Sequence, residues 1–180
     1  SSDVCSSDLD AVWSYATPPL VVPHPAFDLW MPLATFIAAL PMLVAGPSWA
    51  AAQAGTAIAS ACLAPLAWRI GRDAGLANGL DARRTRAVAL TAGLLAATLA
   101  PLVLAGAAPE STTAFSLAGT VVALLIPGAV SGARRPGWRG ALPGIALGVA
   151  LGVAWLARQE AIWLAATVLL CLAWAARREP

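Results

Sequence analysis

Long apolar runs recur along this chain and constrain its fold more than any other feature. A segment that crosses the hydrocarbon core of a bilayer needs about 20 mostly apolar residues. Only 11% of the 180 residues are charged, whereas soluble domains carry about 25%. The sequence therefore predicts an all-α fold, a polytopic transmembrane bundle of five spans. We expect them at residues 49–69, 87–108, 111–131, 140–157 and 161–176, within a bundle domain of residues 49–178.

The charge and the cysteine content exclude several other classes of protein. The formal net charge is only +2, which gives no support for binding to nucleic acid. Three cysteines are too few for a disulfide framework. Cys62 and Cys171 lie inside apolar runs, where we expect buried small hydrophobic side chains. His24 is the only histidine, so the sequence offers no metal site, and it indicates no cofactor.

Arginine is distributed unevenly between the predicted links. If five spans alternate across the membrane, ten of the eleven arginines lie on one side and Arg158 lies on the other. The positive-inside rule assigns the side with ten arginines to the cytoplasm. We therefore expect a multi-pass membrane protein whose C-terminus is cytoplasmic and whose Arg158 is extracytoplasmic.

The first 48 residues precede the predicted bundle and fall into two parts. Ser1–Leu9 repeats Ser-Ser-Asp and resembles a translated sequencing adapter, so we treat this segment as a non-native tail. Residues 10–48 are expected to form an extracytoplasmic loop with a short apolar helix between Pro32 and Gly46. That run is nearer to interfacial or re-entrant length than to a full span. We favour an interfacial or re-entrant helix, with a membrane crossing as the alternative.

Glycine spacing predicts two further features. Gly144, Gly148 and Gly152 recur at every fourth residue, which places them on one helix face and predicts a close approach of two helices. The glycine- and aspartate-containing segment 71–81 predicts a short cytoplasmic loop between the first two spans. This loop lacks the lysine of a phosphate-binding loop.

The charged residues on the extracytoplasmic side are the candidate functional residues: His24, Asp28, Glu110, Arg158 and Glu160. Arg158 is the only arginine predicted on the extracytoplasmic side, and the other ten are predicted on the cytoplasmic side. A guanidinium can form a two-point fork to phosphate, so a lipid phosphate is one candidate partner. Snorkelling to water, or pairing with Glu110 or Glu160, is the alternative.

The remaining three candidates also have structural interpretations. Glu110 precedes a predicted span and can act as a helix-start residue, because an acid is favourable at a helix N-terminus. Asp28 can play the same part before Leu29 and Trp30. His24 lies between two prolines in a predicted loop, where exposure to solvent is the simpler interpretation.

Four sequence segments follow one another in an informative order. HPAFDLWMPL is followed by a short apolar helix with a Gly-Pro-Ser turn and AAAQ, then by PESTTAF, and then by GVAWLARQEAIWL. This order resembles the integral-membrane glycosyltransferases of the GT-C type. That group includes the dolichyl-phosphate-mannose protein mannosyltransferases and the bacterial lipid A aminoarabinose transferases. The resemblance covers about residues 10 to 178.

The resemblance implies a reaction and a location. Such enzymes move a sugar from a polyprenyl-phosphate carrier to an acceptor on the extracytoplasmic face. For this chain we expect the bacterial plasma (inner) membrane. Basic groups hold the phosphate as it leaves, and Arg158 and Glu160 match the family hairpin best. His24, Asp28 and Glu110 are further substrate-binding candidates.

The resemblance also implies that the catalytic residues are missing. The acidic pair that acts as a base in the family follows a first span, and Ser1–Leu9 stands in its place. We therefore expect this chain to be an N-terminal fragment of the enzyme, and to be inactive alone.

The alternative is a transporter fragment or a non-enzymatic membrane subunit. It predicts polar residues near the bilayer midplane, at broken helices. In this sequence the charged residues lie at the ends of the predicted spans, which favours a site at the membrane surface.

Overall fold

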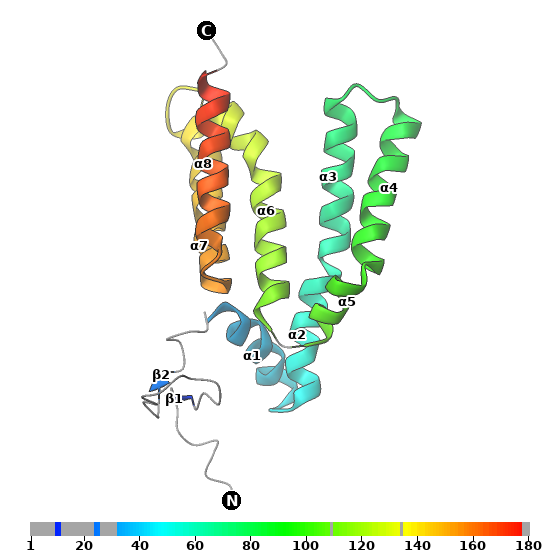
Figure 1. Ribbon diagram of the computed structural model, residues 1–180, viewed down its shortest axis with the longest axis vertical. Coiled ribbons are helices and arrows are strands. Elements are labelled where there is room, and N and C mark those ends of the chain that lie inside the picture. Colours follow the sequence, from blue (N-terminus) through cyan, green and yellow to red (C-terminus); the bar gives the residue numbers. More distant parts are fainter. Residues whose placement is uncertain (1–9, 12–23, 26–31, 109, 134, 178–180) are drawn as a thin grey trace, which may run out of the picture.

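The computed structural model describes residues 10–11, 24–25, 32–108, 110–133 and 135–177, which are almost entirely helical (Figure 1). The helices are α1 (Leu33–Ala45), α2 (Trp49–Ala61), α3 (Leu63–Ala77), α4 (Ala82–Thr98), α5 (Ala100–Ala107), α6 (Ser111–Gly132), α7 (Trp138–Ala157) and α8 (Ala161–Arg177). Two-residue strands, β1 (Asp10–Ala11) and β2 (His24–Pro25), pair antiparallel. The predicted helical fold is confirmed.

Several helices are long and apolar enough to cross a membrane. Three stretches qualify: Trp49–Ala77, which joins α2 and α3, together with α6 and α7. α4 and α5 bend by 48° where they meet, and they make a fourth if the pair is one span. α1 and the apolar part of α8 are shorter. The described residues thus contain three to four candidate spans, and the expected count of five is not confirmed.

Two of the five expected spans are concerned: the bent pair α4–α5, which counts only if it is one span, and α8, which is too short. The 17 residues of α8 give a length of about 25 Å at 1.5 Å per residue. The hydrocarbon core of a bilayer is about 30 Å thick. Length alone therefore does not identify α8 as a span.

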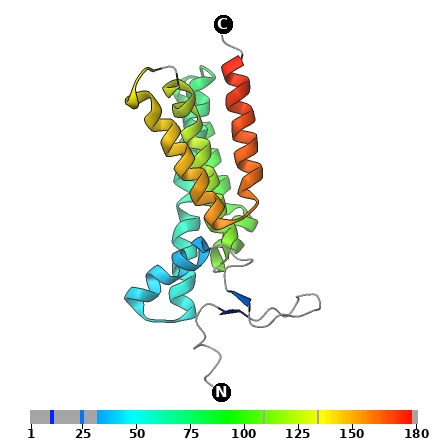
Figure 2. The same ribbon diagram turned by 90° about the vertical axis from the view of Figure 1, so that its left-hand side faces the viewer.

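The turns between helices alternate between two ends of the molecule. The α3–α4 turn, the α6–α7 turn and the C-terminal end of α8 lie at one end, and the α7–α8 turn and α1 lie toward the other (Figures 1 and 2). We call them the arginine end and the Arg158 end. The arginine end and the helix turns leading to it carry eight described arginines: Arg69, Arg72, Arg83, Arg84, Arg86, Arg135, Arg139 and Arg177. Arg134 and Arg178 lie outside the described residues.

The link expected to be a loop over residues 71–81 is mostly helical, so that prediction is wrong. α3 continues to Ala77 and α4 begins at Ala82, which leaves four residues for the turn. The side chain of Asp81 accepts a hydrogen bond from the backbone N–H of Arg84 and caps α4. Gly79 has a φ of 67°, a conformation that glycine adopts without a steric penalty.

The bend between α4 and α5 coincides with a proline. Pro101 lies in the first turn of α5, lacks a backbone N–H, and its ring disfavours a continuous helix. Side chains of α2 then hold α5 in place. Ser60 Oγ donates to the carbonyl of Leu102 at 3.1 Å, and Gln53 Nε2 donates to the carbonyl of Ala107 at 2.7 Å. The carbonyl of Ala107 lies at the C-terminal end of α5, where backbone carbonyls have no intrahelical donor.

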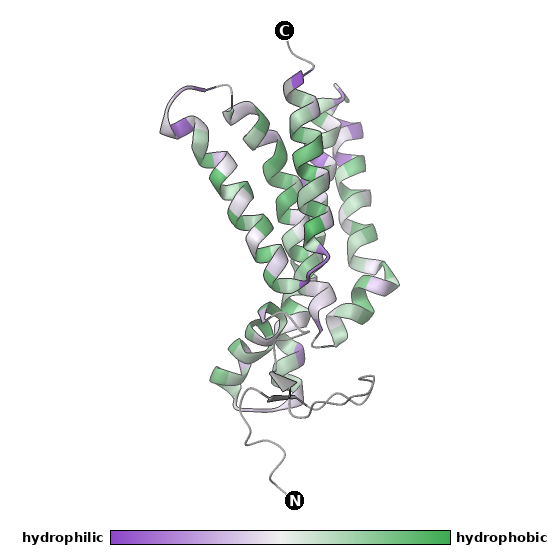
Figure 3. Cartoon of the chain, turned by 60° about the vertical axis from the view of Figure 1, so that its left-hand side comes forward, coloured by the Kyte–Doolittle hydropathy of each residue, from purple (hydrophilic) through white to green (hydrophobic). Residues whose placement is uncertain are grey.

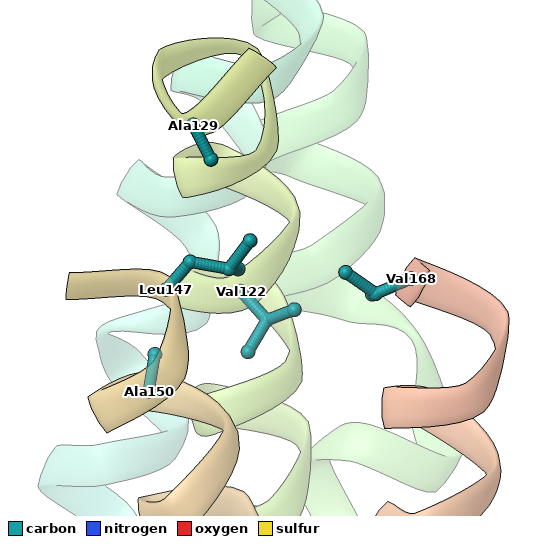
Figure 4. Packing of buried hydrophobic residues seen from close by; sticks show 5 residues of the cluster. All are labelled: Val122, Ala129, Leu147, Ala150 and Val168. Atoms are coloured by element: carbon teal, nitrogen blue, oxygen red, sulfur yellow. The ribbon is translucent and has the colours of Figure 1, made fainter. Parts of the chain in front are cut away.

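α6, α7 and α8 meet in an aliphatic cluster. Val122 of α6 is fully buried and lies between Leu147 of α7 and Val168 of α8 (Figure 4). Ala129 and Ala150 complete the cluster. In a bilayer such close packing, rather than exclusion of water, holds helices together.

Glycines make close helix contacts, but not those that the sequence indicated. A Cβ at Gly144, Gly148 or Gly152 would meet no atom within 4 Å, so the predicted close approach at this stripe is wrong within the described chain. α7 instead faces α6 through a neighbouring stripe that includes Leu147. The close approaches lie elsewhere, and a Cβ at Gly55 of α2 would overlap the backbone oxygen of Ile37 in α1.

The outer faces of the helices are strongly apolar. The helix walls in Figure 3 are mostly green, and most of the purple segments lie toward the arginine end. Leu43 and Val44 of α1 are 81% and 91% exposed, a degree of apolar exposure that suits contact with lipid rather than water. Cys62 and Cys171 are also exposed, so the prediction that they are buried is wrong.

Candidate functional site

The candidate site centres on Arg158, at the junction of α7 and α8. Its backbone is extended, with φ −155° and ψ 141°, and this ends α7. Arg158 Nη2 donates to Glu160 Oε1 at 2.6 Å, and Nε donates to Oε2 at 3.2 Å. Nη1 donates to the hydroxyl of Thr112 on α6 at 3.4 Å. The guanidinium thus joins the α7–α8 turn to the start of α6.

The hydrogen bonds between Arg158 and Glu160 control the protonation of both groups. The hydrogen bond from Arg158, helped by the backbone N–H of Glu160, lowers the pKa of the Glu160 carboxyl to about 2. The same hydrogen bond raises the pKa of Arg158 against the opposing effect of burial, and the charges of Glu160 and Glu110 add to the increase. Both residues are therefore charged at neutral pH.

The ion pair lies at the surface. The side chains of Arg158 and Glu160 are 36% and 56% exposed. Exposed ion pairs contribute little to stability, since water competes for both partners. The pair is therefore better understood as a way to orient the guanidinium than as a source of stability.

Glu110 immediately precedes α6 and occupies its N-cap position, as expected. Its side chain is exposed and makes no capping hydrogen bond, so its contribution there is electrostatic. Its negative charge also acts on Arg158. Glu110, Arg158 and Glu160 therefore belong to one charged group at the Arg158 end.

The positions of the side chains of the other two predicted site residues, Asp28 and His24, are not described. Asp28 lies outside the described residues. His24 belongs to β2, where it is the strand partner of Ala11, and the description of this residue is limited to its backbone. Their membership of the site stays a prediction.

The structure adds threonine residues that the sequence reasoning missed. Thr112 is a partner of Arg158. Thr113 beside it is almost fully buried, and its hydroxyl has no hydrogen-bond partner among the residues that the structure describes. In the sequence both threonines lie in the PESTT segment. Its consecutive hydroxyl residues stand at the end of a predicted span, on the same side as Arg158, and they could have indicated the contact.

An apolar groove of about 520 Å³ lies between α1, α6 and α7. Ala114 lies two residues after Thr112, and Val153 lies five residues before Arg158, so one end of the groove reaches the helix turns that carry the charged group. The lining residues are all apolar: Leu33, Ile37, Ala114, Leu117, Ala118, Val121, Leu125, Ala146, Val149, Ala150 and Val153.

The described parts of the chain contain no cluster of three or more His, Cys, Asp or Glu side chains that could hold a metal ion. The chemistry available at the described site is therefore that of a cation, two carboxylates and a hydroxyl beside an apolar groove.

Comparison of the chain with protein-family models, with curated proteins and with solved structures finds no match. The resemblance to the GT-C glycosyltransferases thus depends on the four sequence segments quoted above, and it stays a prediction.

Proposed function

We propose that this chain is the membrane-embedded part of a glycosyltransferase that moves a sugar from a polyprenyl-phosphate carrier to an acceptor on the extracytoplasmic face. The observation that supports the proposal most is the adjacency of Arg158 to the groove between α1, α6 and α7. A polyprenyl phosphate combines an anionic head with a long apolar chain. The head suits the guanidinium, and part of the chain suits the groove.

In the proposed arrangement five spans cross the bacterial plasma membrane. They are α2–α3, the bent pair α4–α5, α6, α7 and α8. The short α8 crosses where the bilayer thins locally or where flanking side chains snorkel. The arginine end is cytoplasmic under the positive-inside rule, and the Arg158 end faces outward.

The composition of α1 favours a re-entrant helix over an amphipathic helix at the interface. Among its 13 residues only Thr35 carries a polar side chain. An interfacial helix needs a polar face in contact with water and headgroups, which α1 lacks. α1 and α2 form a hairpin whose turn at Gly46, with a φ of 85°, lies at the outer end of the α2–α3 span.

Arg158 has capacity to bind a phosphate while it keeps its present partners. A guanidinium carries five N–H donors, of which Glu160 accepts two and Thr112 accepts one. The two remaining donors are available to a phosphate oxygen, and displacement of Glu160 would release two more. A cation held at this point would stabilise the negative charge of the departing phosphate.

The proposal is tested by binding of the carrier rather than by sugar transfer. The purified chain is placed in lipid nanodiscs with a photo-reactive polyprenyl phosphate, and cross-linking yield is measured against carrier concentration. Arg158→Gln should weaken binding about tenfold or more, because it removes a charge-assisted hydrogen bond of about 1.5–3 kcal/mol. Arg177→Gln removes the same charge at the other end and should leave binding unchanged.

Equal binding by the parent and Arg158→Gln would contradict the proposal. The two variants should also show the same helix content by circular dichroism, since both substitutions lie at helix ends. A loss of helix in Arg158→Gln alone would assign the residue to folding instead of carrier binding.

A transporter fragment is the second candidate, and the bend between α4 and α5 favours it. Transporters form their substrate sites at such broken helices. In this chain the polar side chains near the break, Gln53, Thr56 and Ser60, are not ionisable, and each bonds to a backbone carbonyl. Proteoliposomes that pass small solutes faster than protein-free vesicles, with the flux lost in Gln53→Leu, would support this candidate.

A further inference from the structure

The arginine end carries more positive charge than its own carboxylates balance. Asp73 pairs with Arg69 at 2.8 Å, and Asp81 pairs with Arg84 at 3.4 Å. No other carboxylate lies in the described part of this end. Six exposed arginines therefore have no acidic partner among the described residues: Arg72, Arg83, Arg86, Arg135, Arg139 and Arg177.

Packing of α3 against α4 concentrates part of this charge. A Cβ at Gly75 would lie 3.1 Å from the Cα of Thr85, and one at Gly71 would lie 3.1 Å from the Cα of Ala89. The two helices are therefore close and antiparallel at this point. Arg72 follows the contact residue Gly71, and Arg86 follows the contact residue Thr85. The positions of the two arginines along the helix pair therefore differ by less than one helical turn.

Two of the six arginines stack on exposed tryptophans. The guanidinium carbon of Arg72 lies 5.9 Å from the ring centre of Trp68, and that of Arg139 lies 5.7 Å from the ring centre of Trp138. Stacking engages the flat face of a guanidinium and leaves the N–H donors at its edge available. Tryptophan is enriched at the headgroup level of membranes.

We propose that the arginine end binds anionic phospholipid headgroups, through the phosphodiester groups of the leaflet that surrounds it. The surface changes from charged to apolar within two helical turns of α4, from Arg86 to the exposed Leu90 and Leu94. A lipid satisfies both parts of this surface, because its headgroup meets the arginines and its chains cover the leucines. A soluble polyanion would satisfy only the first. This inference is independent of the proposed glycosyltransferase function.

The test counts lipids that remain bound. The full chain is purified from nanodiscs that contain equal amounts of phosphatidylglycerol and phosphatidylcholine, and retained lipids are counted by native mass spectrometry. Phosphatidylglycerol should be retained preferentially. Each of Arg72→Gln, Arg83→Gln and Arg86→Gln should reduce its apparent affinity about fivefold, the effect of one basic residue near a membrane surface. Arg69→Gln, which removes a guanidinium that Asp73 already neutralises, should have a smaller effect.

Three results would overturn the inference. Equal retention of the two lipids would show that the headgroup charge is not recognised. An equal loss in Arg69→Gln would show that only the total charge matters. Displacement of phosphatidylglycerol by millimolar inorganic phosphate, or by a short RNA at the same ionic strength, would assign the surface to a soluble anion.

Discussion

Arg158 and Glu160, two residues apart in the turn between α7 and α8, are joined by a two-point fork of 2.6 and 3.2 Å. The same guanidinium reaches Thr112, 46 residues away on α6. An arginine placed against the charge bias of the chain is therefore neutralised by a carboxylate beside it. This local partner explains how the positive charge of Arg158 is tolerated at this end. The guanidinium N–H groups that neither Glu160 nor Thr112 engages can donate to a further anion.

The first prediction concerns the pH dependence of this pair. The hydrogen bond from Arg158 lowers the pKa of Glu160 from its usual 4.5 to about 2 in the folded protein. A lowered pKa stabilises the fold above pH 4.5, and that contribution disappears as the pH falls from 4.5 through 2. The infrared carboxylate band of Glu160, assigned by its absence in Glu160→Gln, should persist at pH 4. In Arg158→Gln the band should disappear at a higher pH than in the parent, because only the backbone N–H still lowers the pKa of Glu160. Titration near pH 4.5 in the parent would contradict the fork.

The second prediction compares two glycines. In Gly55→Ala the new Cβ overlaps the backbone of Ile37, so the α1–α2 contact must open, at a cost of about 1–3 kcal/mol. In Gly148→Ala the Cβ enters open space, and the better helix propensity of alanine should stabilise α7 by about 0.5–1 kcal/mol. Thermal unfolding in one detergent measures both. Equal effects of the two substitutions would show that α1 does not pack on α2 as described.

The third prediction concerns two buried threonines. The hydroxyl of Thr113 has no partner in the described part of the chain, so Thr113→Val should be neutral or stabilising by about 1 kcal/mol, because it removes an unsatisfied polar group. The hydroxyl of Thr56 donates to the carbonyl of Gln53 at 3.0 Å. Thr56→Val should therefore cost about 0.6 kcal/mol, a typical value for hydrogen bonds inside membranes. A larger loss in Thr113→Val than in Thr56→Val would reveal a partner for Thr113.

The fourth prediction concerns the start of α4. Asp81→Ala removes the side chain that accepts the N–H of Arg84, and loss of such a cap costs about 1 kcal/mol. The amides of residues 83–86 should exchange hydrogen faster as the first turn frays. Asp73→Ala breaks only an exposed pair within α3 and should leave these amides unchanged. Equal protection in the parent and Asp81→Ala would argue against the cap.

The helical class and the two-ended distribution of arginine could be predicted from the sequence. Both depend on hydropathy and on charge placement at helix ends, which are local properties of the chain. The bend near Pro101 and the continuation of α3 through residues 71–77 could not be predicted in detail. Proline is tolerated in several membrane contexts, and the Gly71 and Gly75 pattern is compatible with a loop as well as with a packed helix.

The site was predicted in part. Arg158 and Glu160 were identified because a lone charged turn interrupts an apolar sequence. The role of Thr112 depends on how α6 and α7 approach each other, and a span-end threonine has many possible partners. The stripe of Gly144, Gly148 and Gly152 illustrates the same limit, since spacing defines a face but does not say what packs on it.

The orientation of the two ends in the membrane can be measured by cysteine labelling. Gln159→Cys in the α7–α8 turn and Asn78→Cys in the α3–α4 turn are made separately, with Cys5, Cys62 and Cys171 replaced by Ala. Intact cells are then treated with a membrane-impermeant maleimide. We expect labelling at position 159 in intact cells and labelling at position 78 only after lysis. Labelling of position 78 from outside, or protection of position 159, would contradict it.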